Sequence, residues 1–159
     1  MKQVVIVIIA LIVSSCYSIF GHPSMGRAYT IEKDGVPCFA LADPDWKDWE
    51  AGYIRLTEKG ESPKVIWEVG IDPPRPVINK KDCVALGQTF ENSEVLVPLS
   101  SEGMLKAGRV YGISMNTSPV GDDRAGRAYS GHFCLSESPS GGWVVHDLGV
   151  KPDACPVAQ

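Results

Sequence analysis

Residues that form turns interrupt this chain so often that few long regular elements fit between them. The 159 residues include 16 glycines and 12 prolines. Proline cannot donate a hydrogen bond to a β-ladder, and glycine accepts the positive φ angles that many turns require. No segment shows the apolar period of an amphipathic helix of three turns. The pattern therefore predicts an all-β domain of about eight or nine short strands.

Individual strands follow from the apolar runs and the turns between them. The dipeptide Asp34-Gly35 lies between apolar runs at 28–32 and 36–41, which predicts a β-hairpin. Residues 43–52 are expected to form a loop or a short helical turn, and the proline-rich residues 72–81 an extended connection. The other predicted strands cover residues 53–57, 64–69, 83–86, 95–99, 110–115, 125–135 and 143–148.

A tyrosine after a glycine turn gives a more specific expectation. Leu105, Gly108 and Tyr111 resemble the tyrosine corner of immunoglobulin-like and fibronectin-type sandwiches, in which the phenol hydrogen-bonds back to the preceding loop. Tyr111, Ile113 and Met115 share one face of the strand by the two-residue period. We therefore expect a single immunoglobulin- or fibronectin-like antiparallel β-sandwich. Any strand preceded by a glycine turn is the alternative explanation.

The start of the chain carries a signal of another kind. Lys2 precedes an uncharged apolar run at residues 4–13, which as a helix would span about 15 Å, roughly half of a bilayer core. The run is therefore too short to cross a membrane and suits a signal peptide. Val13-Ser14-Ser15-Cys16 resembles the lipobox of bacterial lipoproteins, which implies cleavage before Cys16 and attachment of a lipid to its sulfur.

This resemblance divides the chain into three parts. Residues 1–15 would be the signal peptide, 16–26 a lipidated tether, and 27–159 the β-sandwich domain. An ordinary secretory signal cleaved further along and an uncleaved anchor are the alternatives. Cleavage of the signal peptide would remove one lysine, so the formal net charge would change from −4 to −5. An acidic chain of this kind has no electrostatic footprint for nucleic acid.

The remaining cysteines agree with export. An even number of cysteines in an oxidising compartment predicts two disulfides, although spacing alone leaves three connectivities open. A sandwich layout favours one bridge between adjacent strands, Cys38–Cys83, and another, Cys134–Cys155, that pins the C-terminal tail. Buried free thiols are the alternative.

The search for catalytic chemistry finds no motif. His22, His132 and His146 are not spaced as metal ligands, and Ser114 lies inside a predicted strand instead of at a nucleophile elbow. Asp122-Asp123 lacks the spacing of a calcium loop. We therefore expect a protein that is not an enzyme and that has neither a metal nor a cofactor.

A binding surface is the remaining possibility. Residues 43–52 hold four acidic residues and two tryptophans, a combination suited to anchoring and steering a basic partner. The alternative is that one or both tryptophans fold into the core. A second contact loop is expected around the acidic pair. The candidate partner-binding residues are Asp45, Trp46, Asp48, Trp49, Glu50, Asp122 and Asp123.

Several stretches together resemble one protein family. Residues 21–29, 34–39 and 133–135 and the proline-rich segment before Cys83 are similar to small enterobacterial lipoproteins described as type VI secretion system immunity proteins. The resemblance covers most of the chain after the leader, and its motifs are structural. It implies a periplasm-facing protein that binds an incoming antibacterial effector and blocks it by occlusion.

The resemblance also bears on location. Tyr17 follows Cys16, where an inner-membrane lipoprotein often carries aspartate, so a lipid anchor in the outer membrane is expected. The alternative function is a structural or accessory outer-membrane lipoprotein that binds an assembly partner of the envelope.

Overall fold

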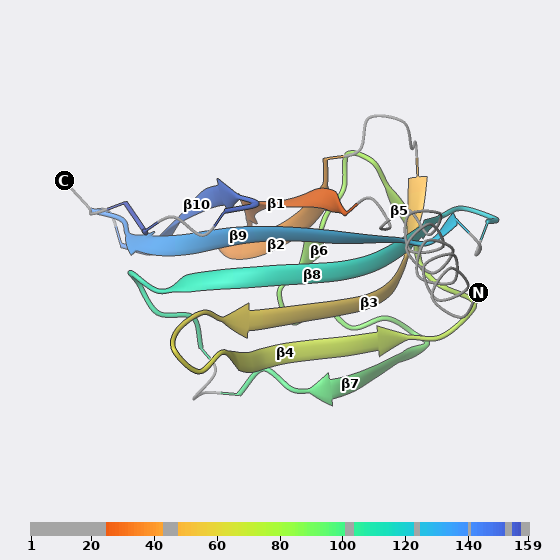
Figure 1. Ribbon diagram of the computed structural model, residues 1–159, viewed down its shortest axis with the longest axis horizontal. Coiled ribbons are helices and arrows are strands. Elements are labelled where there is room, and N and C mark those ends of the chain that lie inside the picture. Colours follow the sequence, from red (N-terminus) through yellow and green to blue (C-terminus); the bar gives the residue numbers. More distant parts are fainter. Residues whose placement is uncertain are drawn as a thin grey trace, which may run out of the picture.

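The domain consists of β-strands and the turns that join them. The computed structural model describes residues 25–42, 48–100, 104–122, 125–139, 141–151 and 154–156. These residues contain ten strands and no α-helix (Figure 1). The strands are β1 (Gly26–Lys33), β2 (Val36–Leu41), β3 (Asp48–Glu58), β4 (Lys64–Ile71), β5 (Val77–Asn79), β6 (Val84–Ala85), β7 (Ser93–Val97), β8 (Val110–Pro119), β9 (Arg127–Glu137) and β10 (Trp143–Gly149). The all-β prediction is confirmed, and no helix within the described ranges has the length and apolarity needed to cross a membrane.

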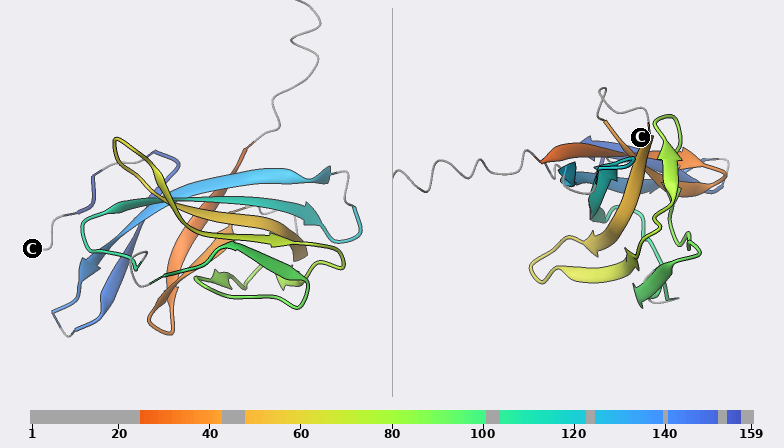
Figure 2. Two further views of the ribbon diagram at one scale, coloured as in Figure 1. Left: turned by 90° about the horizontal axis from the view of Figure 1, so that it is seen from below. Right: turned by 90° about the vertical axis from the view of Figure 1, so that its right-hand side faces the viewer.

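Hydrogen bonds connect the ten strands into one curled sheet. Its order is β6-β2-β1-β9-β8-β3-β4-β7, while β10 pairs with β9 and β5 pairs with β3. The first residues of β1 run parallel to β9, and the rest of β1 pairs antiparallel with β2. The sheet is therefore mixed and not purely antiparallel as predicted, because β1 crosses from one part of it to the other. Figure 2 shows how β3, β4 and β7 bend away from β1 and β2.

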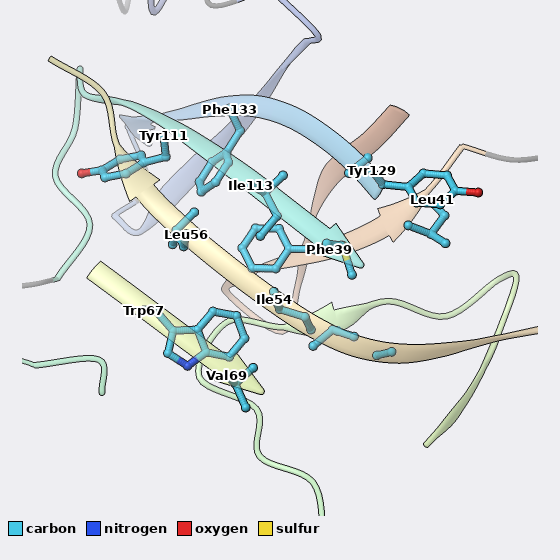
Figure 3. Packing of buried hydrophobic residues seen from close by; sticks show 14 of the residues in the cluster. Phe39, Leu41, Ile54, Leu56, Trp67, Val69, Tyr111, Ile113, Tyr129 and Phe133 are labelled. Carbon is cyan, nitrogen blue, oxygen red and sulfur yellow. The ribbon is translucent and has the colours of Figure 1, made fainter. Parts of the chain in front are cut away.

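The hydrophobic core fills the inside of this curl. Leu56 of β3 lies opposite Trp67 of β4 on one side and Ile113 of β8 on the other. Phe39 of β2 completes the core, with its ring centroid 6.3 Å from that of Trp67 and 5.7 Å from that of Phe133. All five side chains are at most 1% exposed (Figure 3). Burial of rings of this size supplies much of the driving force for folding.

A glycine allows the two parts of the sheet to approach closely. Gly131 of β9 faces β1, and a Cβ atom at this position would overlap the carbonyl oxygen of Ala28. The main chain of β1 can therefore cross directly over β9 only because residue 131 has no side chain.

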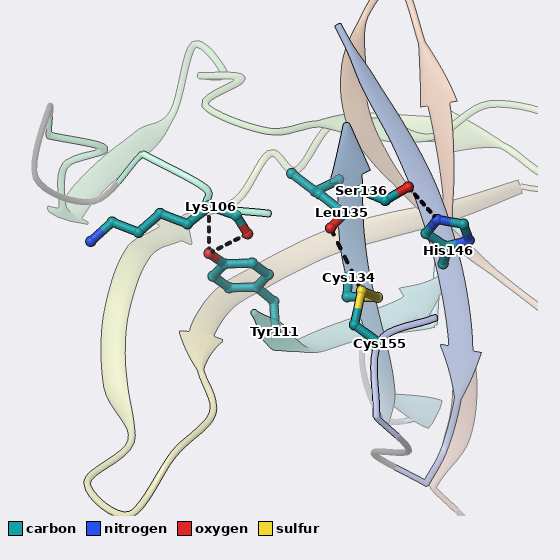
Figure 4. Close-up of a disulfide and its surroundings, with 7 residues drawn as sticks. All are labelled: Lys106, Tyr111, Cys134, Leu135, Ser136, His146 and Cys155. Carbon is teal, nitrogen blue, oxygen red and sulfur yellow. Dashed lines mark hydrogen bonds between the residues drawn. A yellow bond between two sulfur atoms is a disulfide. The ribbon is translucent and has the colours of Figure 1, made fainter. Parts of the chain in front are cut away.

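Two local predictions are confirmed in detail. Asp34 and Gly35 form the turn between β1 and β2 with φ angles of 54° and 80°, as a two-residue hairpin requires. The phenol oxygen of Tyr111 accepts a hydrogen bond of 2.7 Å from the backbone N–H of Lys106, so it ties β8 to the preceding loop (Figure 4).

Both disulfides are present with the pairing that the sandwich layout favoured. Cys38 of β2 is bonded to Cys83, which precedes β6. Cys134 of β9 is bonded to Cys155 of the C-terminal tail. Each bridge therefore fixes a segment with little regular structure to a buried position of a longer strand.

Two segments differ from the sequence prediction. Strand β3 begins at Asp48, so the second half of the predicted loop 43–52 belongs to a strand. In the expected connection 72–81, residues Val77–Asn79 form β5 and pair with the start of β3. The prolines of this connection precede Val77, so the three residues of β5 keep their N–H groups for the ladder.

Candidate functional site

The structure brings the two predicted contact segments together at one end of the sheet. Trp49 lies opposite Pro119 and Glu50 opposite Ser118 in the β3–β8 pairing. The N–H of Asp122 donates a 3.1 Å hydrogen bond to the carbonyl of Pro119. We call this region, residues 48–50 and 118–122, the β3/β8 end; it lies on the right in Figure 1.

Some of the predicted contact residues fall outside the described part of the chain. Asp45, Trp46 and Asp123 belong to this group, as does the proposed lipidation site Cys16. Their roles stay predictions.

Trp49 requires a correction. Its side chain is 2% exposed and packs in the hydrophobic core, so it is not available as an interface anchor. The physical reason is strand alternation, because Trp49 points inward while its neighbours Asp48 and Glu50 point outward. The alternative left open by the sequence, a core tryptophan, is the one found.

The acidic residues of this end remain at or near the surface. Asp48 and Glu50 are half-buried, and Asp122 is exposed. The side-chain amide of Asn79 in β5 donates a 2.9 Å hydrogen bond to the carboxylate of Asp48. Contact of Asp48, Glu50 and Asp122 with a partner stays a prediction. The structure places all three residues at the β3/β8 end.

Beside these acids lies a polar hollow that the sequence did not reveal. It has a volume of about 390 Å³, within the size range of sites for small ligands or single side chains. We call it the arginine hollow. It is lined by Gly52, Tyr53, Arg75, Asn116, Thr117, Ser118, Gly126, Arg127 and Ala128.

The two arginines come from separate parts of the chain. Arg75 belongs to the proline-rich connection and lies over Gly52, where an added Cβ atom would be only 3.2 Å from its Nε. Arg127 is the first residue of β9 and is exposed. Both arginines also interact with other residues of the chain. Sequence reasoning missed them because only the sheet topology makes them neighbours.

Two buried hydroxyl groups also belong to this hollow. Ser118 is 1% exposed and Thr117 is 4% exposed, and neither hydroxyl has a hydrogen-bond partner among the described residues. Ser118 lies on the same face of β8 as Asn116, whose exposed side chain lines the hollow. The Ser118 hydroxyl is therefore directed toward the hollow, whereas Thr117 points to the other face.

A charged cluster flanks the hollow on the outer face of the sheet. Arg55 donates two hydrogen bonds of 3.1 Å to the carboxylate of Glu68, and the Tyr53 phenol donates a third of 2.8 Å. The hydrogen bonds from Arg55 hold the pKa of Glu68 below its usual value. Burial and the adjacent Glu68 carboxylate raise the pKa of Tyr53. These groups satisfy one another's hydrogen bonds, and Tyr53 is the member of the cluster that lines the hollow.

A second hollow lies at the opposite end of β8 and β9. It has a volume of about 590 Å³ and is bordered by the Cys134–Cys155 bridge, with Cys155 Sγ 3.6 Å from the carbonyl oxygen of Leu135. The Ser136 hydroxyl lies 2.8 Å from Nε2 of His146 (Figure 4). The neighbouring carboxylate, Asp147, points to the other face of β10.

This serine–histidine pair does not have the geometry of an activated nucleophile. Asp147 forms an ion pair with Arg27 and accepts a hydrogen bond of 3.3 Å from the backbone N–H of Thr30. It is therefore committed elsewhere and does not orient the His146 ring, as a third catalytic residue would. Ser136 and His146 are a cross-strand pair that joins β9 to β10.

The histidines of the strands do not form a metal site. Within the described residues, no group of three or more histidine, cysteine, aspartate or glutamate side chains is placed to hold a metal ion. Burial lowers the pKa of His132, and the nearby Lys59 lowers it further, so this ring favours the neutral form.

Comparison with known proteins adds no assignment. No family model, curated protein or solved structure matches this chain. The interpretation of the site therefore depends on its geometry and chemistry alone.

Proposed function

We propose that this protein is a lipid-anchored immunity protein that faces the periplasm, binds a type VI secretion effector and neutralises it by occlusion. The immunoglobulin-like sandwich belongs to the same proposal, as the scaffold that presents the binding surface. The resemblance of the leader to a lipoprotein signal and of the domain to this family of immunity proteins supports the assignment.

The observation that carries the proposal is the construction of the β3/β8 end. Two segments about 70 residues apart in the sequence, 48–50 and 118–122, are held together by strand pairing. Outward acidic side chains and the arginine hollow lie side by side there, on strands fixed by the core. A rigid surface that presents charges of both signs is suited to specific recognition of a protein, because little ordering cost is incurred on binding.

The two disulfides fit the same location. They form in oxidising compartments such as the periplasm and are rare in the cytosol. Anchoring would add to the affinity of the site by holding it at high local concentration where an effector arrives.

The proposal is tested by competition between sibling strains. A strain lacking this gene should be killed by an attacker that delivers the cognate effector, and a copy of the gene should restore survival. The matched variant Cys16→Ser should bind the effector in solution but protect poorly. Normal survival of the deletion strain against every effector encoded beside the gene would contradict the immunity function.

An accessory role in the envelope is the second candidate. It predicts that the chain, cross-linked in cells that encounter no attacker, is recovered with a constant partner of the envelope. An immunity protein should instead be recovered with its effector.

A further inference from the structure

We propose that the arginine hollow is a carboxylate-binding site that receives an aspartate or glutamate side chain from the partner protein. This inference rests on the proposed function, because it names the chemistry by which the partner would be recognised. It adds a basic contact to a surface for which the sequence had indicated only acidic ones.

The guanidinium groups supply the first part of the argument. Arg75 and Arg127 both line this hollow, in a chain whose formal net charge is −4. A planar guanidinium matches a carboxylate with two parallel hydrogen bonds, which a lysine cannot provide. A local basic site on an acidic protein attracts an anionic group while the rest of the surface repels it, so the preference is for one position.

The glycine beneath Arg75 supplies the second part. A Cβ atom added to Gly52 would lie only 3.2 Å from Nε and 3.3 Å from Cζ of Arg75, so a side chain at residue 52 would press against the guanidinium. Because residue 52 has no Cβ, the guanidinium can lie flat against β3 and face the hollow. Arg75 is accordingly half-buried, which strengthens its attraction for an anion relative to an arginine in bulk water.

The buried hydroxyl supplies the third and independent part. Ser118 is 1% exposed, is directed toward the hollow, and has no hydrogen-bond partner among the described residues. A buried hydroxyl without a partner is costly, by about 1–3 kcal/mol. A carboxylate oxygen in the hollow would accept its hydrogen bond, and the exposed amide of Asn116 would add another donor.

The size of the hollow favours a side chain of a protein over a lone inorganic anion. Its volume of about 390 Å³ exceeds that of phosphate or sulfate and accommodates an acidic side chain together with part of its backbone. Glu50 lies opposite Ser118 in the β3–β8 pairing but is not among the residues that line the hollow. The Glu50 carboxylate therefore does not fill the hollow.

The binding test uses the purified chain and a pair of short peptides. The probes are acetyl-Ser-Glu-Gly-amide and its counterpart with glutamine in place of glutamate, titrated while the arginine Nε–H and backbone amide signals are followed by NMR. The glutamate peptide should shift the signals of Arg75, Arg127 and Gly52 in a saturable manner. The glutamine peptide should bind at least about tenfold more weakly, since each tenfold factor is about 1.4 kcal/mol.

Three variants show whether the effect belongs to the hollow. Arg75→Gln and Arg127→Gln should each reduce the affinity for the glutamate peptide at least about fivefold, consistent with loss of one charge-assisted hydrogen bond. Arg109→Gln is the matched control, because Arg109 precedes β8 at the opposite end of that strand, pairs with Glu58 and does not line the hollow. It should leave the affinity unchanged. An equal effect of all three variants would mean nonspecific electrostatics and would overturn the proposal.

Further experiments distinguish a carboxylate from a free oxyanion as the ligand, and failure of the carboxylate site from failure of the immunity function. If inorganic phosphate saturates the same signals and the glutamate peptide does not, the hollow is a site for a free oxyanion and the inference fails. If Arg75→Gln and Arg127→Gln bind the effector and protect cells like the unchanged chain, the inference fails while the immunity function stands. If the peptide binds as expected but deletion of the gene confers no sensitivity, the immunity function fails and the carboxylate site stands.

Discussion

The two disulfides offer a test in which similar covalent changes should have different consequences. The perturbation is replacement of each cystine by a pair of alanines, Cys38→Ala with Cys83→Ala, or Cys134→Ala with Cys155→Ala. Cys38 and Cys134 are buried to 1% and 0% exposure, so alanine avoids placing an unpaired hydroxyl in the core.

The magnitude follows from the length of chain that each bridge closes. The bridged residues are 45 and 21 positions apart. Loop-closure entropy then gives a stabilisation of about 4 kcal/mol for the first bridge and about 3.3 kcal/mol for the second. The loop between Cys38 and Cys83 contains β3, β4 and β5, which stay in the sheet without the bridge, so its full value should be lost.

The bridge to the tail should cost less than its loop length suggests. The alanine replacement also removes the contact of the Cys155 sulfur with the carbonyl of Leu135, so the tail loses both of these ties to β9. The released tail regains conformational freedom in the folded state, which offsets part of the loss. We therefore expect the two variants to differ by more than the calculated difference of about 0.7 kcal/mol.

Urea denaturation of the unchanged chain and of the two variants, without reductant, measures the free energy of unfolding that each variant loses. The free energy of unfolding should fall by about 4 kcal/mol for the first pair, and the m value should rise because a chain with fewer cross-links exposes more surface. A larger loss for the Cys134–Cys155 pair, or an unchanged m value for both, would refute the reasoning.

Three further substitutions test the fold. Tyr111→Phe leaves the backbone N–H of Lys106 without its phenol acceptor and should lower the free energy of unfolding by about 1–2 kcal/mol, measured by urea denaturation. Gly131→Ala should cost at least about 2 kcal/mol because the added methyl group meets the main chain of β1, whereas Gly60→Ala, with no atom within 4 Å of its Cβ, should not lower the melting temperature. The hydrogen-bonded Glu68 carboxylate contributes its full stabilisation above its unfolded pKa of about 4.3. This contribution is lost as the pH falls through the lower folded pKa. In Glu68→Gln, the free energy of unfolding should therefore fall less between about pH 5 and pH 3 than in the unchanged chain.

The local parts of the fold were predictable from the sequence. Asp34-Gly35 specifies its turn through two positive φ angles, and residues on either side can pair only as a hairpin. The tyrosine corner is equally local, since Tyr111 bonds to a residue five positions earlier. Such features depend on neighbours in the chain, which the sequence displays directly.

The arrangement of the strands was not predictable in the same way. The parallel contact of Gly26 and Arg27 with β9 joins residues about 100 positions apart, and no periodicity records it. The arginine hollow was missed for the same reason, because Arg75 and Arg127 become neighbours only through the topology. For Trp49, the acidic and aromatic composition of its segment suggested an interface anchor. The sequence did not reveal that β3 begins at Asp48, and the alternation of that strand turns the Trp49 side chain into the core.

The start of β1 and the arginine hollow lie at the same end of the domain. β1 begins at Gly26 beside Tyr129, two residues along β9 from Arg127 of the hollow. If Cys16 carries the lipid as proposed, nine residues of chain lie between it and Gly26, so the two are at most about 35 Å apart. A partner bound at the hollow would then be held close to the membrane surface, which is where occlusion is needed if the effector attacks the lipid or a layer just above it.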